Sequence, residues 1–364
     1  MDTMREHETR EIDPHREPLG KVERRHLRHR WHRRVLVISR AITAIVVLIV
    51  VVLAAMLVGT NVLQDYLSLD EYRELADEVI LLLQVPLLIL VLRAVNSAKH
   101  YATGALANEQ QFEHVHAIVE HYSRLAGLKR TPSVAIVTDG RFIAKSISNY
   151  GKAAILVNSD LVDAPRPNSN DWGALRFAIA REIGHIAAGH RDLVYELTTA
   201  VTQSTPYLST PLRRAEAYTA DRYGAVLAPD AVSDYFAVDA VSKDCWQDMS
   251  IRSAVSGVGK NKIGQVIVGL VGEVPPTSWR LQALAQLGVF RCEPEPSHAA
   301  SPAEYRDFLR NLPIKPTRIA DLRRLHGAFL LPPKPMTERD LDELCPKGTI
   351  GERLSQAFAA YSES

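Results

Sequence analysis

A long uncharged apolar segment near the N-terminus constrains this chain more than any other feature of its sequence. Residues 41–63 carry no charge, and every residue from Ile45 to Leu53 is apolar. A helix of about 20 apolar residues spans the ~30 Å hydrocarbon core of a bilayer. A buried helix of a soluble protein is seldom so long, and a cleaved signal peptide would have a shorter basic flank. We therefore expect a first transmembrane helix at residues 35–63.

A second apolar segment, at residues 79–95, predicts a second crossing. It contains Gln84 and Pro86, so a core helix is the alternative interpretation. Basic residues precede the first segment and follow the second, whereas residues 64–78 between them are acidic. Under the positive-inside rule both basic flanks stay in the cytoplasm. The sequence thus predicts a multi-pass protein of the cell membrane, in contact with the lipid bilayer, whose N-terminus and main domain are cytoplasmic.

Charge and cysteine content exclude some classes of protein. The formal net charge of the 364 residues is +1, so no nucleic-acid partner is expected. The three cysteines are too few and too scattered to predict a disulfide framework or a cysteine-rich metal site. Residues 1–34 are rich in Arg, His and Glu and poor in apolar side chains, which predicts a basic disordered cytoplasmic tail. No oligomeric state is predicted.

The remaining chain predicts an α+β fold that is mainly helical and has a small sheet. Apolar residues recur at helical spacing over 108–128, and two short β-branched stretches, 133–137 and 153–157, read as strands. We place a main domain at 96–290 and a helical C-terminal extension at 291–364. Further helices are expected at 172–188, 213–226, 279–287, 303–311, 316–327 and 337–344, with an apolar core or interfacial stretch at 263–271.

The helix expected at 172–188 carries a near-match to a zinc motif. In the H-E-x-x-H motif two histidines on one helix face bind zinc, and the glutamate activates a metal-bound water. Here Glu182 and His185 stand at the right spacing, but Arg181 occupies the position of the first histidine. A helix can show R-E-x-x-H by chance, so this run alone is a weak signal.

Three ordered motifs give that run a context. Residues 178–190 read AIAREIGHIAAGH, residues 111–119 read QFEHVHAIV, and residues 215–225 read AEAYTADRYGA. Together with the apolar hairpin, they resemble the membrane zinc metallopeptidases typified by the heat-shock protease HtpX and the CAAX prenyl endopeptidase. The resemblance covers about residues 40–290. It implies a zincin-like domain of the gluzincin type, with a metal site between the second and third motifs.

Transferring the family's roles residue by residue implies a damaged metal site. The ligand positions fall on Arg181, His185 and Ala217, the base on Glu182, and an acidic residue that orients the first ligand on Asp221. The family's His-Pro-Pro segment reads Val-Pro-Pro at 274–276, and its edge strand has no clear copy near residues 145–148.

The chemistry of these residue types predicts that no metal is bound. A guanidinium group stays protonated and has no lone pair to give, and Ala217 has no donor atom. Two nearby residues are expected to point elsewhere on ideal helices: Glu216 by ~100° and His190 by ~140°. One ligand of three remains, whereas protein zinc sites use three or four. Glu182 is then a vestigial general base.

Arg181 is expected to face Asp221 and Glu182, so that an ion pair replaces the metal as a link between two helices. The alternative is an arginine that extends into solvent.

Three functions follow from these expectations. The first is a membrane pseudopeptidase that binds unfolded or membrane protein segments. The second is an active zinc metalloendopeptidase with substitute ligands drawn from Glu182, His185, His190, Glu216 and Asp221. The third is a purely structural membrane scaffold.

Overall fold

The structure is a computed structural model. It describes residues 11–12, 18–59, 66–138, 140, 143–149, 152–166, 171–258, 262–286, 301, 304, 307, 317–318, 332–344 and 347–362. Within these ranges the chain is mostly helical and contains a small four-stranded sheet. The expected mainly helical character and the small sheet are thereby confirmed.

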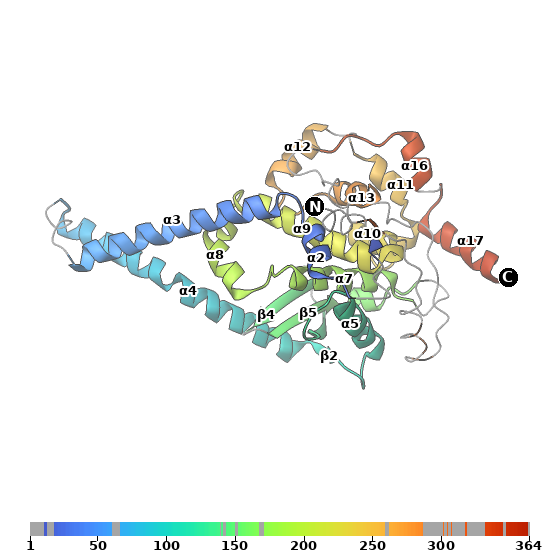
Figure 1. Cartoon of the computed structure of the whole chain (residues 1–364), viewed down its shortest axis with the longest axis horizontal. Coiled ribbons are helices and arrows are strands. Elements are labelled where there is room, and N and C mark those ends of the chain that lie inside the picture. The colour runs from blue at the N-terminus through green and yellow to red at the C-terminus, as the bar shows by residue number, and fades with distance from the viewer. Residues whose placement is uncertain are drawn as a thin grey trace, which may run out of the picture.

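Two long helices, α3 (His32–Gly59) and α4 (Leu69–Thr103), extend away from the rest of the chain (Figure 1). Both are long and apolar enough to cross a membrane. Only 11% and 6% of their most apolar stretches are buried. The core helix of a soluble domain would instead be largely covered, so the exposed apolar surface favours association with a membrane.

Helix α4 begins earlier than the sequence predicts. The second apolar segment was expected at 79–95, after an acidic loop at 64–78. In the structure the acidic residues from Asp70 onward already belong to α4. A capping box explains this start: Ser68 N donates to Glu71 Oε2 over 2.8 Å, and Glu71 N donates to Ser68 Oγ over 3.4 Å. Pro86 lies inside the helix.

The N-terminal segment before α3 is ordered against the main domain, so the prediction of a disordered tail is wrong for residues 18–34. Helix α2 (Lys21–Leu27) buries Leu27 completely, and Leu19 N donates to Leu125 O over 2.7 Å. Arg24 Nη1 donates to Gly127 O over 2.9 Å. These few contacts compensate for the low apolar content of the segment. Residues 1–10 and 13–17 lie outside the described residues, and strand β1 (Glu11–Ile12) pairs with β6 (Thr317–Arg318).

The four-stranded sheet has the order β2-β3-β5-β4. Its strands are β2 (Ala105–Ala107), β3 (Ser133–Val137), β4 (Ala144–Asn149) and β5 (Lys152–Asn158). β3 and β5 are parallel, and the other two pairings are antiparallel. The expected strands at 133–137 and 153–157 are confirmed, whereas β2 and β4 were not expected. β4 forms one edge of the sheet, close to α7.

The helices of the main domain are α5 (Glu113–Leu125), α6 (Ser159–Val162), α7 (Gly173–Ala187), α8 (Leu193–Ser204), α9 (Ser209–Leu227), η2 (Pro229–Ala231) and α10 (Val232–Ala240). The helices expected at 172–188 and 213–226 correspond to α7 and α9. α5 begins later than the expected residue 108, because the Asn108 side chain accepts hydrogen bonds from the backbone N–H groups of Gln110 and Gln111 and closes a turn.

Further elements follow α10: η3 (Trp246–Asp248), α11 (Ile251–Ser256), α12 (Lys262–Val271), α13 (Thr277–Ala285), α16 (Glu338–Leu344) and α17 (Ile350–Ser362). The segments expected at 263–271, 279–287 and 337–344 agree with α12, α13 and α16. The expected helix at 316–327 is wrong where it can be checked, because residues 317–318 form strand β6. The rest of that segment and most of 303–311 lie outside the described residues.

Helix α7 is the centre of the domain and packs most closely against α9. A Cβ atom on Gly184 would lie 2.5 Å from Tyr223 Cβ, so this position accepts only glycine without a shift of the helices. At the other end of α7, a buried network of two arginines and three aspartates holds the helix start. Its members are Arg166, Asp171, Arg176, Asp230 and Asp234. These contacts fix where α7 presents its polar side chains.

Candidate functional site

Arg181 faces α9, as the sequence predicts. Its Nε donates to Asp221 Oδ1 over 3.0 Å, and its Nη1 donates to Glu182 Oε1 over 2.6 Å. The Arg181 side chain is only 13% exposed. The predicted ion pair between the two helices is therefore confirmed, and the alternative of an arginine extended into solvent is wrong.

Asp221 binds a second arginine that the sequence did not indicate. Arg280 on α13 donates from Nε to Asp221 Oδ2 and from Nη2 to Asp221 Oδ1, both over 2.7 Å. Arg280 also reaches Asp239 at 3.3 Å. Burial opposes ionisation of Asp221, but the charges of Arg280 and then Arg181 outweigh it and lower the pKa of this carboxyl. Three helices thus meet at one ionised carboxylate.

Glu182, the expected base, has both carboxylate oxygens engaged. Oε1 accepts from Arg181, and Oε2 accepts from Ser146 N on β4 over 2.7 Å. The side chain is 2% exposed. A general base needs a free lone pair within reach of the proton that it removes. Here Glu182 instead connects α7 to the edge strand of the sheet, in the region where the sequence showed no clear strand.

His185 and His190 lie together, which contradicts the expected orientation of His190. The estimate of ~140° assumed a continuous helix, but α7 ends at Ala187 and Gly189 has a φ of +75°. This turn brings His190 back toward the helix, with its N–H donating to His185 O over 3.0 Å. The two Nδ1 atoms are 3.0 Å apart.

Glu216 completes a cluster with these histidines. Its carboxylate accepts a hydrogen bond from the Tyr195 hydroxyl on α8 over 2.6 Å. One potential ligand atom from each of His185, His190 and Glu216 lies within 4.8 Å of the others, and all three residues are buried. Glu216 was expected to point ~100° away from the third ligand position that the resemblance implies; in the structure it joins a different cluster, which includes His190 and excludes Arg181. Ala217 is buried and offers no donor.

Burial sets the protonation of the cluster. It is the main cause that lowers the pKa of His185 and of His190 well below the ordinary value. It also raises the pKa of Glu216, and burial together with Glu216 raises the pKa of Tyr195. At neutral pH both imidazoles are thus uncharged, which is the form that binds metals, and Tyr195 remains a donor.

The N-terminal segment covers this cluster. The His32 ring at the start of α3 lies 4.9 Å from the His190 ring and stacks on Tyr195 at 6.3 Å. Arg28 Nη2 donates to Ala188 O over 3.0 Å. Sequence reasoning missed His32 and Tyr195, because neither lies in a motif and both approach the site only through the packing of α3 and α8.

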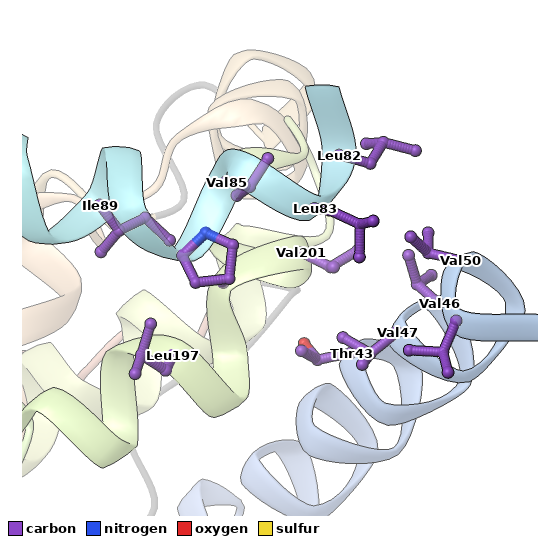
Figure 2. Close-up of a pocket in the computed structure, with 13 residues that line it drawn as sticks. Thr43, Val46, Val47, Val50, Leu82, Leu83, Val85, Ile89, Leu197 and Val201 are labelled. Atoms are coloured by element: carbon purple, nitrogen blue, oxygen red, sulfur yellow. The ribbon is translucent and has the colours of Figure 1, made fainter. Parts of the chain in front are cut away.

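An apolar pocket of about 320 Å³ lies between α3, α4 and α8 (Figure 2). Thr43 carries the only hydroxyl among the side chains that line it, and none of them is titratable. A charged ligand would lose its hydration there without compensation. The lining residues are Thr43, Val46, Val47, Val50, Val51, Leu82, Leu83, Val85, Pro86, Ile89, Leu197, Ala200 and Val201.

No protein family, no curated protein and no solved structure matches this chain. The fold and the site define a mostly helical protein with two candidate membrane helices, an ion-pair network between α7, α9 and α13, and a buried cluster of two histidines and a glutamate.

Proposed function

We propose that the chain is a membrane-anchored pseudopeptidase: a protein similar to the HtpX-type metallopeptidases that has lost hydrolysis and binds peptide or partner segments. One observation carries the proposal. Arg181 occupies the position that the resemblance assigns to the first zinc ligand, and Asp221 and Glu182 hold its guanidinium in place. A metal ion at that position would meet a fixed positive charge.

The hydrogen bonds and burial of Glu182 also support the loss of hydrolysis. One oxygen accepts from Arg181 and the other from Ser146 N, and the side chain is 2% exposed, so an attacking water has little access to this carboxylate. Freeing it would break a buried charge-assisted hydrogen bond, which costs about 1.5–3 kcal/mol.

The edge of β4 is the surface on which a peptide would bind. Ser146 N points away from β5, toward α7. Because backbone N–H groups alternate along a strand, those of Ala144 and Ser148 point to the same outer side. Among the described residues no strand pairs with this side of β4. The Ser146 N–H is occupied by Glu182, so an extended segment would add through the outward groups of Ala144 and Ser148 on either side of it.

The membrane topology belongs to the same proposal. The basic residues before α3 and after the apolar part of α4 favour a cytoplasmic N-terminus and main domain under the positive-inside rule. Arg93 near that end of α4 forms an ion pair with Glu196, and Arg40 Nε donates to Thr198 Oγ1 over 3.2 Å. Both contacts join the membrane helices to α8, so the domain is tied to the bilayer at α8.

Cleavage of fluorescent casein tests the loss of hydrolysis. The full chain in detergent micelles is expected to cleave no faster than Glu182→Gln, with or without a chelator. Cleavage that the chelator abolishes and that Glu182→Gln lacks would refute the pseudopeptidase and support the second candidate, a zinc endopeptidase. That candidate is favoured by the proximity of His185, His190 and Glu216.

Binding of a reduced and carboxymethylated, hence unfolded, protein tests the retained interaction. Ser148→Pro removes one outward N–H from an edge strand, where proline is tolerated. It should weaken binding about tenfold, the equivalent of one hydrogen bond. Ser148→Thr keeps the N–H and a hydroxyl and should bind like the natural chain. If neither form of the chain binds the unfolded protein, the structural scaffold remains as the better explanation.

A further inference from the structure

We propose that His185, His190 and Glu216 form a binding site for a zinc-class divalent cation, displaced from the position that the family resemblance implies. The site requires no hydrolysis and goes beyond the proposed function. It draws on the end of α7, the turn that follows it, and α9, whereas Arg181 and Ala217 take no part.

The spacing of the donor atoms suits a small metal ion. Two ligands on a tetrahedral zinc ion with bonds of about 2.0–2.1 Å lie roughly 3.3–3.4 Å apart. His185 Nδ1 and His190 Nδ1 are 3.0 Å apart, and a Glu216 oxygen lies within 4.8 Å of one ring nitrogen of each histidine. Shifts of a few tenths of an ångström for the imidazoles and somewhat more for the longer glutamate side chain would close the site.

The donor set is that of zinc enzymes and zinc-binding proteins. Two neutral imidazoles and one carboxylate favour zinc and its neighbours over calcium or magnesium, which prefer oxygen ligands alone. Tyr195 donates to Glu216 Oε1 over 2.6 Å. Such a hydrogen bond is the usual support that orients a ligating side chain from behind.

The protein does not satisfy the cluster by itself. His190 Nε2 is buried and has no hydrogen-bond partner among the described residues. A buried polar atom without a partner is costly and commonly marks an ion or a water molecule in native proteins. A hydrogen bond between the two Nδ1 atoms leaves Nε2 unpaired, and a metal held through both Nδ1 atoms does so too, so this atom does not distinguish those two states.

Arginine side chains act on the cluster through their charge: Arg181 and Arg191 on His185, and Arg191 and Arg28 ahead of Arg181 on His190. Glu182 and Asp221 neutralise Arg181, and Arg280 pairs with Asp221 and Asp239. The buried Glu216 accepts a hydrogen bond from the neutral Tyr195 hydroxyl, and the charges of Arg191 and Arg213 also favour its ionised form. Burial of an ionised carboxylate costs free energy unless an opposite charge lies close to it, and a bound divalent ion would provide such a charge.

Metal analysis of the full chain tests the site. Protein purified in detergent, stripped with a chelator and dialysed against zinc should retain one equivalent. Cobalt in its place should give the visible absorption of a four-coordinate ion. His190→Ala should retain less than a tenth of an equivalent, Glu216→Gln should bind at least tenfold more weakly, and Tyr195→Phe about tenfold more weakly.

The control is His116→Ala, which removes a histidine of α5 outside the cluster and should retain the full equivalent. Glu216→Gln changes the side-chain size least, so it decides the outcome if His190→Ala does not fold. Absence of metal in the natural chain, or equal retention in Glu216→Gln, would overturn the site and leave a hydrogen-bonded pair only. Bound zinc without casein cleavage supports both proposals, and bound zinc with cleavage refutes the pseudopeptidase alone.

Discussion

Arg181 and Asp221 face each other across the contact between α7 and α9, with Arg181 Nε donating to Asp221 Oδ1 over 3.0 Å. Asp221 is shared, because Arg280 binds both of its oxygens from α13. The pair that the sequence predicts is thus one side of a three-helix junction. The two arginines differ in that Arg280 makes two hydrogen bonds to Asp221 and Arg181 makes one.

We expect Arg280→Ala to destabilise the domain more than Arg181→Ala. Loss of Arg280 leaves a buried carboxylate with one partner and should cost about 3–5 kcal/mol. Loss of Arg181 leaves Asp221 with Arg280 and Glu182 with Ser146 N, so about 2 kcal/mol is expected. Denaturant unfolding in detergent measures both. Arg213→Ala, which removes a partly exposed ion pair with Glu273, should change little. Equal costs for the two arginines would contradict a shared Asp221.

Docking of the N-terminal segment leads to a second prediction. Leu27 is completely buried, whereas Val22 on the same helix is 47% exposed. Leu27→Ala should cost about 2–5 kcal/mol, because it leaves a cavity in the core, and should speed amide hydrogen exchange over residues 19–29. Val22→Ala is the matched control and should leave both quantities within error. Rapid amide exchange over residues 19–29 in the natural chain would instead support the prediction of a disordered tail.

The sequence predicted the helices and strands whose pattern is local. Strand 133–137 and the helices around Arg181 and Asp221 follow from periodicity and breakers, and the ion pair between those two residues follows from placing the motifs on facing helices. β4 pairs with β5, which follows it after two residues, but A-K-S-I-S-N holds a single β-branched residue and its contact with the Glu182 carboxylate is distant in sequence, so no local pattern marked it as a strand.

The site was harder to predict for a geometric reason. The helical-wheel estimate for His190 fails because α7 ends three residues earlier and Gly189 reverses the chain. The estimate for Glu216 fails because it was measured against a metal centred on Arg181. The roles of Tyr195, His32 and Arg280 depend on tertiary packing alone, and no local pattern marks them.

The proposed topology can be checked with the chain's own cysteine. Cys245 in the main domain is exposed, and Tyr66, which precedes α4, is 83% exposed. With Cys292 and Cys345 replaced by serine, a membrane-impermeant maleimide should label Cys245 only after the cells are permeabilised. Tyr66→Cys, in a chain that also carries Cys245→Ser, should be labelled in intact cells, because the residue lies between the two crossings. The reverse labelling pattern would show that the main domain lies outside the cell and that Tyr66 lies inside it.

Acid should weaken the buried network at the start of α7. Burial would raise the pKa of Asp230, but Arg176, whose Nη2 donates to Asp230 Oδ2 over 2.5 Å, outweighs it and lowers this pKa from the ordinary 3.8 to about 2. Because the folded-state pKa lies below the unfolded value, the ionised carboxylate stabilises the fold above pH ~4. That contribution, about 2 kcal/mol, is lost as the pH falls toward 2.

The difference in unfolding free energy between the natural chain and Asp230→Asn should therefore be constant from pH 7 to pH 4.5 and shrink by about 2 kcal/mol between pH 4 and pH 2. Asp160→Asn supplies the control, since Asp160 is 53% exposed and pairs with Lys243 at the surface. Its difference from the natural chain should stay small throughout. A difference for Asp230→Asn that does not change with pH would show that Arg176 stabilises the neutral and the ionised carboxyl equally.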